Sequence, residues 1–395
     1  MKHKSSSIPI YVLLIVAALF LLISAEYDWN NFNSYEGYNT ASLQYVRGRV
    51  ETIHSEVLTK DDTDAQRFLG EQEITVIILE GEQAGAHIRL TNYLTRVHNV
   101  QAKEGTRLII CADTPENAEP YYSVFNYDRS IPLGGLILLL ALSLICIGQK
   151  KGLLALLGVI FTLLTIMLFT IQAIYHGFSP VNISMLTILI TSSFCLLLLN
   201  GISRRTATAF GGTLFGVLAV GGIFLIFSGL LHLSGYNLDT AESLTLVSES
   251  TGLSIRYLLL ACTLISAMGA VMDVAVSLTA ALDELIAHNP NIEQRAIFQS
   301  GLNIGKDMIG TMSNTLILAY AGSAMPTLLC LIAYGYSMRQ FISSDFLAVE
   351  MIQGICATVG VVLTVPITAI IAAWLLGDNN SNLTFVHKKQ LFKFK

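Results

Sequence analysis

Polar and ionisable residues interrupt the stretch between Gly269 and Gly322, which is otherwise compatible with lipid. Such groups are costly in hydrocarbon, and within membrane spans they commonly bind ions or carry protons. The functional site is therefore expected in this stretch. Its polar and ionisable residues include Asp273, Asp283, Glu284, Lys306, Asp307 and Asn314.

The first half of the stretch predicts a helix with one small and polar face. Its residues recur at steps of three, four and seven positions, which keeps them on the same side of an α-helix. Such a face is expected to point at protein or water rather than at lipid. The residues are Ser266, Gly269, Asp273, Ser277 and Glu284.

The second half predicts a following helix with a similar face, formed by Asn303, Asp307, Gly310, Thr311 and Asn314. Two antiparallel neighbours whose polar faces meet would line one cavity. In that cavity the carboxylates would bind a cation or a proton, and amides and hydroxyls would serve as neutral ligands. The predicted ion- or substrate-binding residues are Asp273, Ser277, Asn303, Asp307, Thr311 and Asn314.

Depth in the membrane follows from the rise of a helix. If the first of these helices enters the outer leaflet near Leu253, Asp273 lies about 30 Å along it, in the inner third of the bilayer. Asp307 then begins the next helix at a comparable level, and Asn314 lies about 10 Å deeper.

A purely structural role for these charges remains open. Lys306 would then pair with Asp273 or Glu284 at the membrane interface and hold two helix ends together. Asn314 favours binding, because an amide deeper in the span has no interfacial role, although an interhelical hydrogen bond would also satisfy it. Further along, Ala319 to Pro326 predicts either a proline kink or a broken helix that aims backbone groups at an ion.

The elements that must position these residues are transmembrane helices. The chain of 395 residues is 53% hydrophobic and 13% charged, which favours a polytopic membrane protein over a soluble globule. A span needs about 20 mostly apolar residues. On that test eight helices are predicted: Ile8 to Ser24, Ile131 to Gly148, Gly152 to Tyr175, Ile183 to Asn200, Ala207 to Leu233, Leu253 to Leu282, Gly305 to Tyr334 and Phe346 to Leu376.

Orientation follows from the basic residues, because positively charged connections stay in the cytoplasm. Both termini are therefore predicted inside a cell membrane. The first helix is interpreted as an uncleaved anchor, since Ser24-Ala25-Glu26 is a poor cleavage site. The residues predicted on the cytoplasmic side are Lys2, Lys4, Lys150, Lys151, Arg204, Arg205, Arg295, Lys306, Lys388, Lys389, Lys393 and Lys395.

The domain order follows from these spans. Residues 1–25 form the anchor, 26–130 an extracytoplasmic domain, 131–377 a seven-helix membrane core and 378–395 a basic cytoplasmic tail. Short β-forming segments in the second part favour a small antiparallel barrel or sandwich, with an OB-like barrel as one alternative. These segments are Tyr45 to Ile53, Glu73 to Leu79, Ala86 to Leu90, Arg107 to Cys111 and Tyr121 to Tyr127.

Three strings and one dipeptide resemble the YibE/F-like family of bacterial multi-pass membrane proteins. They are GAVMDVAVSLTAALDEL, Asn289-Pro290, SGLNIGKDMIGTMSNTLILAYAG and VLTVPITAIIAAWL. The resemblance covers about residues 135 to 376. It implies an integral protein of the bacterial cell envelope with an extracytoplasmic N-terminal region before the membrane core. It implies no particular substrate or reaction.

Function is expected to be transport rather than catalysis. The chain contains no phosphate-binding loop, HExxH or GxSxG motif, so neither an enzymatic activity nor a cofactor is expected. An intramembrane aspartyl hydrolase is disfavoured, because the usual glycine-flanked aspartate at mid-depth is missing. A secondary transporter for an ion or small solute is predicted. The alternative is an envelope scaffold whose outer domain binds a partner protein or wall polymer. The lipid bilayer and an envelope protein or second copy are the expected partners, and nucleic acid is not.

Overall fold

A computed structural model of the chain describes residues 10–27, 42–81, 83–115, 119–236 and 240–377. The chain divides into two compact units. A β-rich unit comprises Glu36–Ser143, and a helical unit combines Met1–Tyr35 with Leu144–Lys395. The predicted basic tail and the predicted cytoplasmic residues Lys2 and Lys4 lie outside the described residues.

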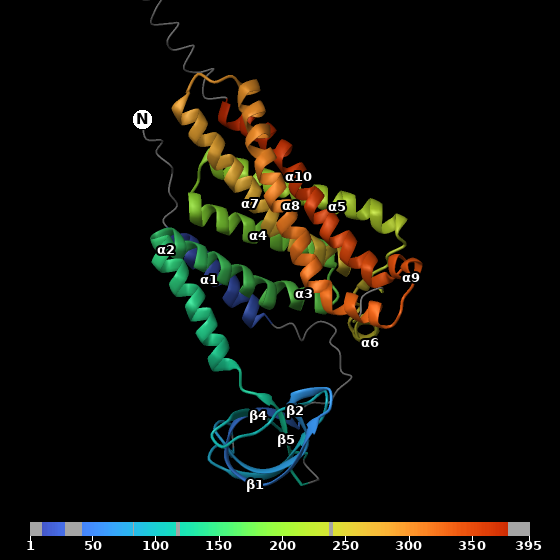
Figure 1. Ribbon diagram of the computed structural model, residues 1–395. Coiled ribbons are helices and arrows are strands. Elements are labelled where there is room, and N and C mark those ends of the chain that lie inside the picture. Colours follow the sequence, from blue (N-terminus) through green and yellow to red (C-terminus); the bar gives the residue numbers. More distant parts are fainter. Residues whose placement is uncertain (1–9, 28–41, 82, 116–118, 237–239, 378–395) are drawn as a thin grey trace, which may run out of the picture. The chain divides into compact units, whose positions relative to one another are not determined.

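The β-rich unit contains the predicted five strands. They are β1 (Leu43–Asp61), β2 (Asp64–Ile78), β3 (His87–Leu94), β4 (Arg107–Asp113) and β5 (Tyr121–Tyr127). All neighbours are antiparallel, in the order β3-β2-β1-β4-β5, and the sheet curls into a half-barrel (Figure 1). The first two strands extend beyond their predicted ends, because they pair with each other as far as Asp61 and Asp64. The expectation of a small β-rich domain is confirmed.

Alternating apolar side chains form the core of the half-barrel, and Ile74 and Val76 are fully buried there. Two polar side chains, Gln72 and Asn92, are buried beside them. The Asn92 amide donates to Gln72 Oε1 over 3.2 Å, and the backbone N–H of Ala102 donates to the same oxygen over 2.9 Å. Because buried polar groups are costly unless they are paired, these bonds fix the segment after β3 to the sheet.

Six helices of the described chain are long and apolar enough to cross a membrane. The shorter helices are α1 (Ile10–Glu26), α6 (Ala241–Thr251) and α9 (Met338–Ile342). The expectation of a multi-pass helical membrane protein is confirmed at this level. The six long helices are Ser130–Tyr175, α4 (Pro180–Asn200), α5 (Arg204–Leu230), Ile255–His288, α8 (Gln294–Ala333) and α10 (Asp345–Gly377).

The predicted count of eight spans is not confirmed. The first predicted span corresponds to α1, whose 17 residues make it shorter than the other candidates. The second and third predicted spans fall within one segment of 46 residues. This segment consists of α2 (Ser130–Thr165), a π-helical turn (Ile166–Thr170) and α3 (Ile171–Tyr175).

Within α2 the chain turns sharply at Gln149, whose backbone angles are φ 49° and ψ −128°. In an uninterrupted helix, residues eight positions apart are separated by about 12 Å. A Cβ atom on Gly152 would instead collide with the carbonyl oxygen of Leu144. The two apolar halves of α2 are therefore joined by a tight turn rather than by a straight helix.

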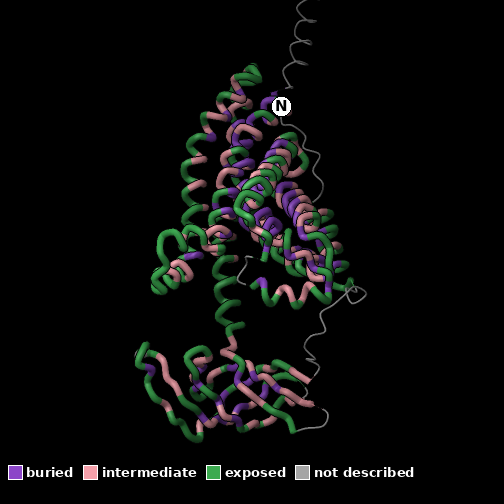
Figure 2. Tube along the Cα trace, turned by 90° about the vertical axis from the view of Figure 1, so that its right-hand side faces the viewer, coloured by how far each residue is buried: buried purple, intermediate pink, exposed green. Residues whose placement is uncertain are grey.

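The core of the helical unit lies where α5, α10 and α7 (Leu258–His288) meet, and α8 packs along α10. Buried positions gather on the faces that these helices turn towards one another (Figure 2). Gly212 and Gly216 of α5 lie so close to Thr368 and Thr364 of α10 that a Cβ on either glycine would collide with the threonine hydroxyl. Their G-x-x-x-G spacing thus lets the backbones of α5 and α10 approach closely.

Neither Pro326, next to the predicted site region, nor Pro366 breaks its helix. Pro326 lies inside α8, which runs without interruption from Gln294 to Ala333. Pro366 lies inside α10 in the same way. The alternative of a broken helix that aims backbone carbonyls at an ion is therefore wrong for α8.

Candidate functional site

Asp273 lies at the middle of α7, fifteen residues from each end of that helix. This is about 22 Å from either end at 1.5 Å per residue. From the sequence, Asp273 is predicted nearer the cytoplasmic end of its helix, because the helix is expected to enter the membrane near Leu253. In the structure α7 begins at Leu258 and continues to His288, which moves the carboxylate to the centre.

The packing against α5 gives an independent measure of this depth. The residues two positions before and after Asp273 lie against Gly216 and Gly212, so Asp273 is level with the segment between those glycines. That level is about ten residues, or 15 Å, from Arg204 at the start of α5, and 15 Å is about half the hydrocarbon thickness of a bilayer. Asp273 is thus placed near mid-depth if Arg204 marks the membrane boundary.

A groove of about 340 Å³ adjoins Asp273, between α4, α7 and α8. Its walls are mostly apolar, and Asp273 is the one charged residue among those that line it. Residues that line the groove include Leu196 and Leu199 from α4, Gly269 from α7, and Met312 and Thr315 from α8.

The carboxylate of Asp273 makes no hydrogen bond or ion pair with the residues that the structure describes. Its side chain is exposed, as is that of Ser277 one turn further along α7. The carboxylate therefore lies exposed beside an apolar groove, without a partner among the described residues.

The polar face of α8 points away from α7. Gly305 packs against Val365 of α10, and Met312 lines the groove. Since two residues advance about 200° around an α-helix, Asp307 and Asn314 lie on the opposite side of α8, and both are exposed.

Two other predicted ligands, Asn303 and Thr311, are also exposed. Asn303 lies one turn from Asp307 on the outward side, whereas Thr311 lies one turn before Thr315, which lines the groove. The described part of a single chain therefore does not form the expected cavity shared by Asp273 and Asp307. The physical reason is that Gly301 and Gly305 of α8, and not Asp307 or Asn314, make the close contact with the bundle.

The predicted pairing of Lys306 with Asp273 or Glu284 is not formed in the described part of the chain. Lys306 Nζ donates to Asn303 Oδ1 on its own helix over 3.3 Å. Glu284 lies 3.6 Å from His288, one turn away on α7, and both side chains are largely exposed. Because such exposed pairs contribute little to stability, neither fixes one helix to another.

Tyr320 joins three helices at one side of the groove, and sequence reasoning missed it. Its hydroxyl lies 2.9 Å from the hydroxyl of Ser266 on α7. Its ring lies against Gly354 of α10, where a Cβ would be 3.4 Å away. The spacing of residues within α8 gives no signal for this contact, because it depends on how the three helices cross.

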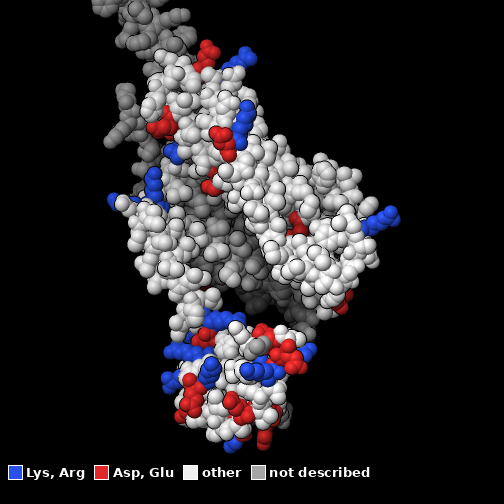
Figure 3. Space-filling model, in the orientation of Figure 1, with Lys and Arg blue, Asp and Glu red and all other residues white. Residues whose placement is uncertain are grey.

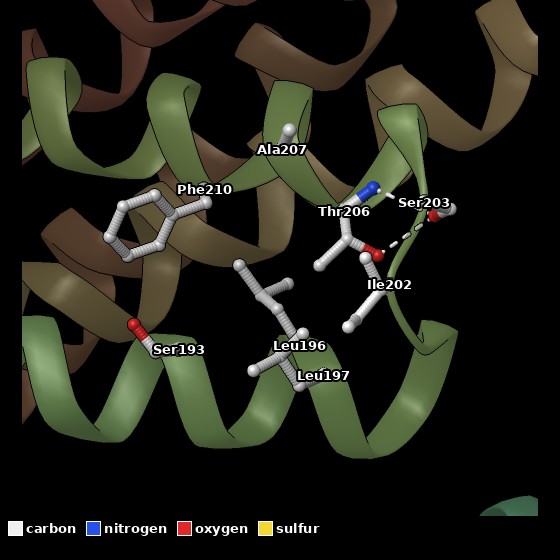
Figure 4. A pocket seen from close by; sticks show the side chains of 8 residues that line it. All are labelled: Ser193, Leu196, Leu197, Ile202, Ser203, Thr206, Ala207 and Phe210. Carbon is white, nitrogen blue, oxygen red and sulfur yellow. Dashed lines mark hydrogen bonds between the residues drawn. The ribbon is translucent and has the colours of Figure 1, made fainter. Parts of the chain in front are cut away.

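A second hollow, of about 240 Å³, lies between α4 and α5 near their connection (Figure 4). Leu196, Ile202 and Phe210 line it, and none of the residues that line it is ionisable. Ser203 caps α5 beside the hollow, where its hydroxyl oxygen accepts a hydrogen bond from the backbone N–H of Thr206 over 3.1 Å. The lining of this hollow therefore favours an apolar group over an ion.

Carboxylates of the β-rich unit have structural partners. A hydrogen bond from Arg89 holds the pKa of Glu73 below its usual range. The backbone N–H of Thr63 likewise lowers the pKa of Asp61, through a hydrogen bond of 3.0 Å. No three His, Cys, Asp or Glu side chains in the described ranges gather in a way that could hold a metal ion.

Comparison with known proteins gives one match. The family model described as YibE/F-like protein matches residues 136–378, which is about three fifths of the chain. No curated protein and no solved structure matches. The matched region contains α7, α8 and the groove beside Asp273.

Proposed function

This chain belongs to the YibE/F-like family, and from that premise we propose that it is a secondary transporter or permease of the bacterial cell membrane. The substrate would be an ion or a small solute, coupled to proton or cation binding. One observation carries this proposal: the unpaired carboxylate of Asp273 lies at the middle of α7 beside an apolar groove. A mobile cation or proton would neutralise it there.

The proposed topology has eight spans, with both termini in the cytoplasm and the β-rich unit outside. The turn at Gln149 supports a division of α2 into two spans. Arg204 at the start of α5 donates to the carbonyl oxygen of Leu375 near the end of α10 over 3.2 Å. This contact supports a common membrane side for the two ends, and the basic residues there favour the cytoplasm.

In the proposed mechanism Asp273 binds the coupling proton or cation, and Ser277 supplies a neutral oxygen one turn away. Asn303, Asp307 and Asn314 remain proposed ligands, but as a second set on the outward side of α8, and Thr311 remains a proposed ligand between that side and the groove. Release of the ion would leave a charged carboxylate beside an apolar groove, which is unfavourable. Ion binding at Asp273 would therefore be coupled to the arrangement of α4, α7 and α8, which form the groove.

The test is an Asp273→Asn variant in reconstituted vesicles, with flux of protons, Na⁺ and Mg²⁺ followed separately. The amide keeps the shape of the carboxylate but cannot be titrated, so coupled flux is expected to fall at least about tenfold, the scale of a lost ion ligand. Asp283→Asn is the matched control, because Asp283 lies on the same helix but does not line the groove. Unchanged flux in well-folded Asp273→Asn protein would refute the proposed role.

A second candidate is an envelope scaffold that transports nothing. The β-rich unit favours this candidate, because it has its own hydrophobic core. Its strand order supports our proposal of an OB-like barrel. OB-like barrels bind oligosaccharides and other polymers. Removing residues 30–128 separates the two candidates. Loss of partner or polymer binding with intact flux would place transport in the helices, whereas absent flux in every form of the protein would favour the scaffold.

A further inference from the structure

α8 is the least covered of the six long helices. Only 6% of its most apolar 18-residue segment is buried, whereas the corresponding share in the other five lies between 22% and 56%. It nevertheless carries the charged residues Lys306 and Asp307 and the amide of Asn314, all of them exposed. Charged side chains on the visible face of the helical unit gather towards the end where α7 and α8 are joined (Figure 3).

The outward side of α8 forms a continuous seam. Its members follow one another at alternating steps of four and three residues, the spacing that keeps two parallel helices in contact along one line. All of them are exposed. The seam consists of Asn303, Asp307, Gly310, Asn314, Ile317 and Ala321.

From this seam we infer that the outward side of α8 is an interface with a second copy of the same chain. Two copies inserted in the same direction are related by a two-fold axis along the membrane normal, so their α8 helices run parallel and equal residues meet at equal depth. The inference does not rest on the proposed role of Asp273, but it gives Asn303, Asp307 and Asn314 of the second proposed ligand set a place in the interface.

The charges of the seam complement those of a second copy. Lys306 flanks the seam one position before Asp307, so in a parallel pair the ammonium of one copy lies level with the carboxylate of the other. Among the described residues of one chain, Lys306 has only the amide of Asn303 as a partner. Membrane charges that are left exposed to lipid are costly, and reciprocal pairing of Lys306 with Asp307 would satisfy two of each.

Asn314 and Gly310 suit the same arrangement. A carboxamide both donates and accepts hydrogen bonds, so Asn314 can bond to its own counterpart, and an asparagine at such a seam position favours a specific register between parallel helices. Outside α8's own nearby backbone, no described heavy atom lies within 4 Å of a Cβ placed on Gly310. The glycine therefore has no packing role against the described residues of one copy, but it would let two helix backbones approach closely.

The test is the mass of the full chain in lipid nanodiscs, measured by native mass spectrometry. The wild type is expected at twice the chain mass of 43.0 kDa. Gly310→Trp is expected at the single-chain mass, because the indole would occupy the seam. Gly222→Trp is the matched control and should remain a dimer, since Gly222 is exposed on α5 and also has no neighbour within 4 Å.

Charge reversal provides a second arm. Lys306→Asp should lower the dimer fraction at least tenfold, and adding Asp307→Lys should restore it. Three results would overturn the inference. They are a wild-type mass of 43.0 kDa, a wild-type chain that is found bound to a different protein instead of a second copy, and a Gly310→Trp protein that remains dimeric.

A third experiment tests the interface even if the tryptophan and charge-reversal variants fail to fold. Asn314→Cys in native membranes should form a disulfide-linked dimer on mild oxidation, above the background from the native cysteines of the wild type. Gly222→Cys should not rise above that background. An Asn314→Cys protein that fails to cross-link would also overturn the inference.

Discussion

Substitution of Gly216 by alanine tests whether α5, α7 and α10 are held at the observed separation. A Cβ on Gly216 would lie 2.6 Å from Cγ1 of Val271 on α7 and closer still to the hydroxyl of Thr364 on α10. Carbon atoms in favourable contact are about 3.5 to 4.0 Å apart, so at least one of the two neighbouring helices must move by about 1 Å.

The magnitude follows from two opposing effects. One extra methyl group in a well-packed core costs about 1 to 3 kcal/mol. Replacing glycine by alanine inside a helix recovers about 0.5 to 1 kcal/mol. The net loss expected for Gly216→Ala is therefore about 0.5 to 2 kcal/mol, which corresponds to a fall of about 1 to 8 °C in melting temperature on the scale of large domains.

The assay is thermal unfolding of the purified full chain in detergent. Gly222→Ala is the matched control, because Gly222 lies on the same helix and a Cβ there meets nothing within 4 Å. It should unfold at or slightly above the wild-type temperature. If Gly216→Ala also unfolds at or above that temperature, the close packing described for these three helices is incorrect.

Three further variants report on other parts of the chain. Gln149→Gly should raise the melting temperature, because the positive φ of Gln149 is unfavourable for any residue with a Cβ; a decrease would contradict the sharp turn. Tyr320→Phe removes the hydrogen bond to Ser266 and should cost about 0.5 to 1.5 kcal/mol in detergent melting; no loss would mean that the bond is absent in solution. Hydrogen bonds from Ser130 lower the pKa of Asp128 in the folded state, so its contribution to stability is complete above the unfolded-state pKa and is lost as the pH falls through the folded-state pKa. Melting of Asp128→Asn should therefore depend less on pH in the acidic range, and an unchanged dependence would contradict this role.

Asp273 could be predicted as a candidate because a carboxylate inside an apolar span is rare whatever surrounds it. Its depth could not, because a small shift in the start of α7 moves it towards the centre of the helix. The residues from α4 that complete the groove are leucines, which carry no signal that separates them from any other membrane-facing residue. The groove therefore depends on helix packing that residue types do not encode locally.

The direction of the α8 polar face was predicted incorrectly for a different reason. A period of 3.6 residues shows that polar residues share one side of a helix, but it does not show which neighbour that side faces. A usable signal was present in Gly301 and Gly305, which are four residues apart and pack against Ala369 and Val365 of α10. If these glycines are assigned the contact with α10, Asp307 and Asn314 are predicted on the outward side of α8.

The most direct test of the proposed transport is the response of flux to an imposed pH gradient across vesicles that contain the full chain. Flux is expected to follow the gradient in the wild type and in Asp283→Asn, and Asp273→Asn should remove this response while the protein still unfolds at the wild-type temperature. Flux that ignores the gradient, or an Asp273→Asn protein that follows it like the wild type, would contradict titration of the Asp273 carboxylate as the coupling step.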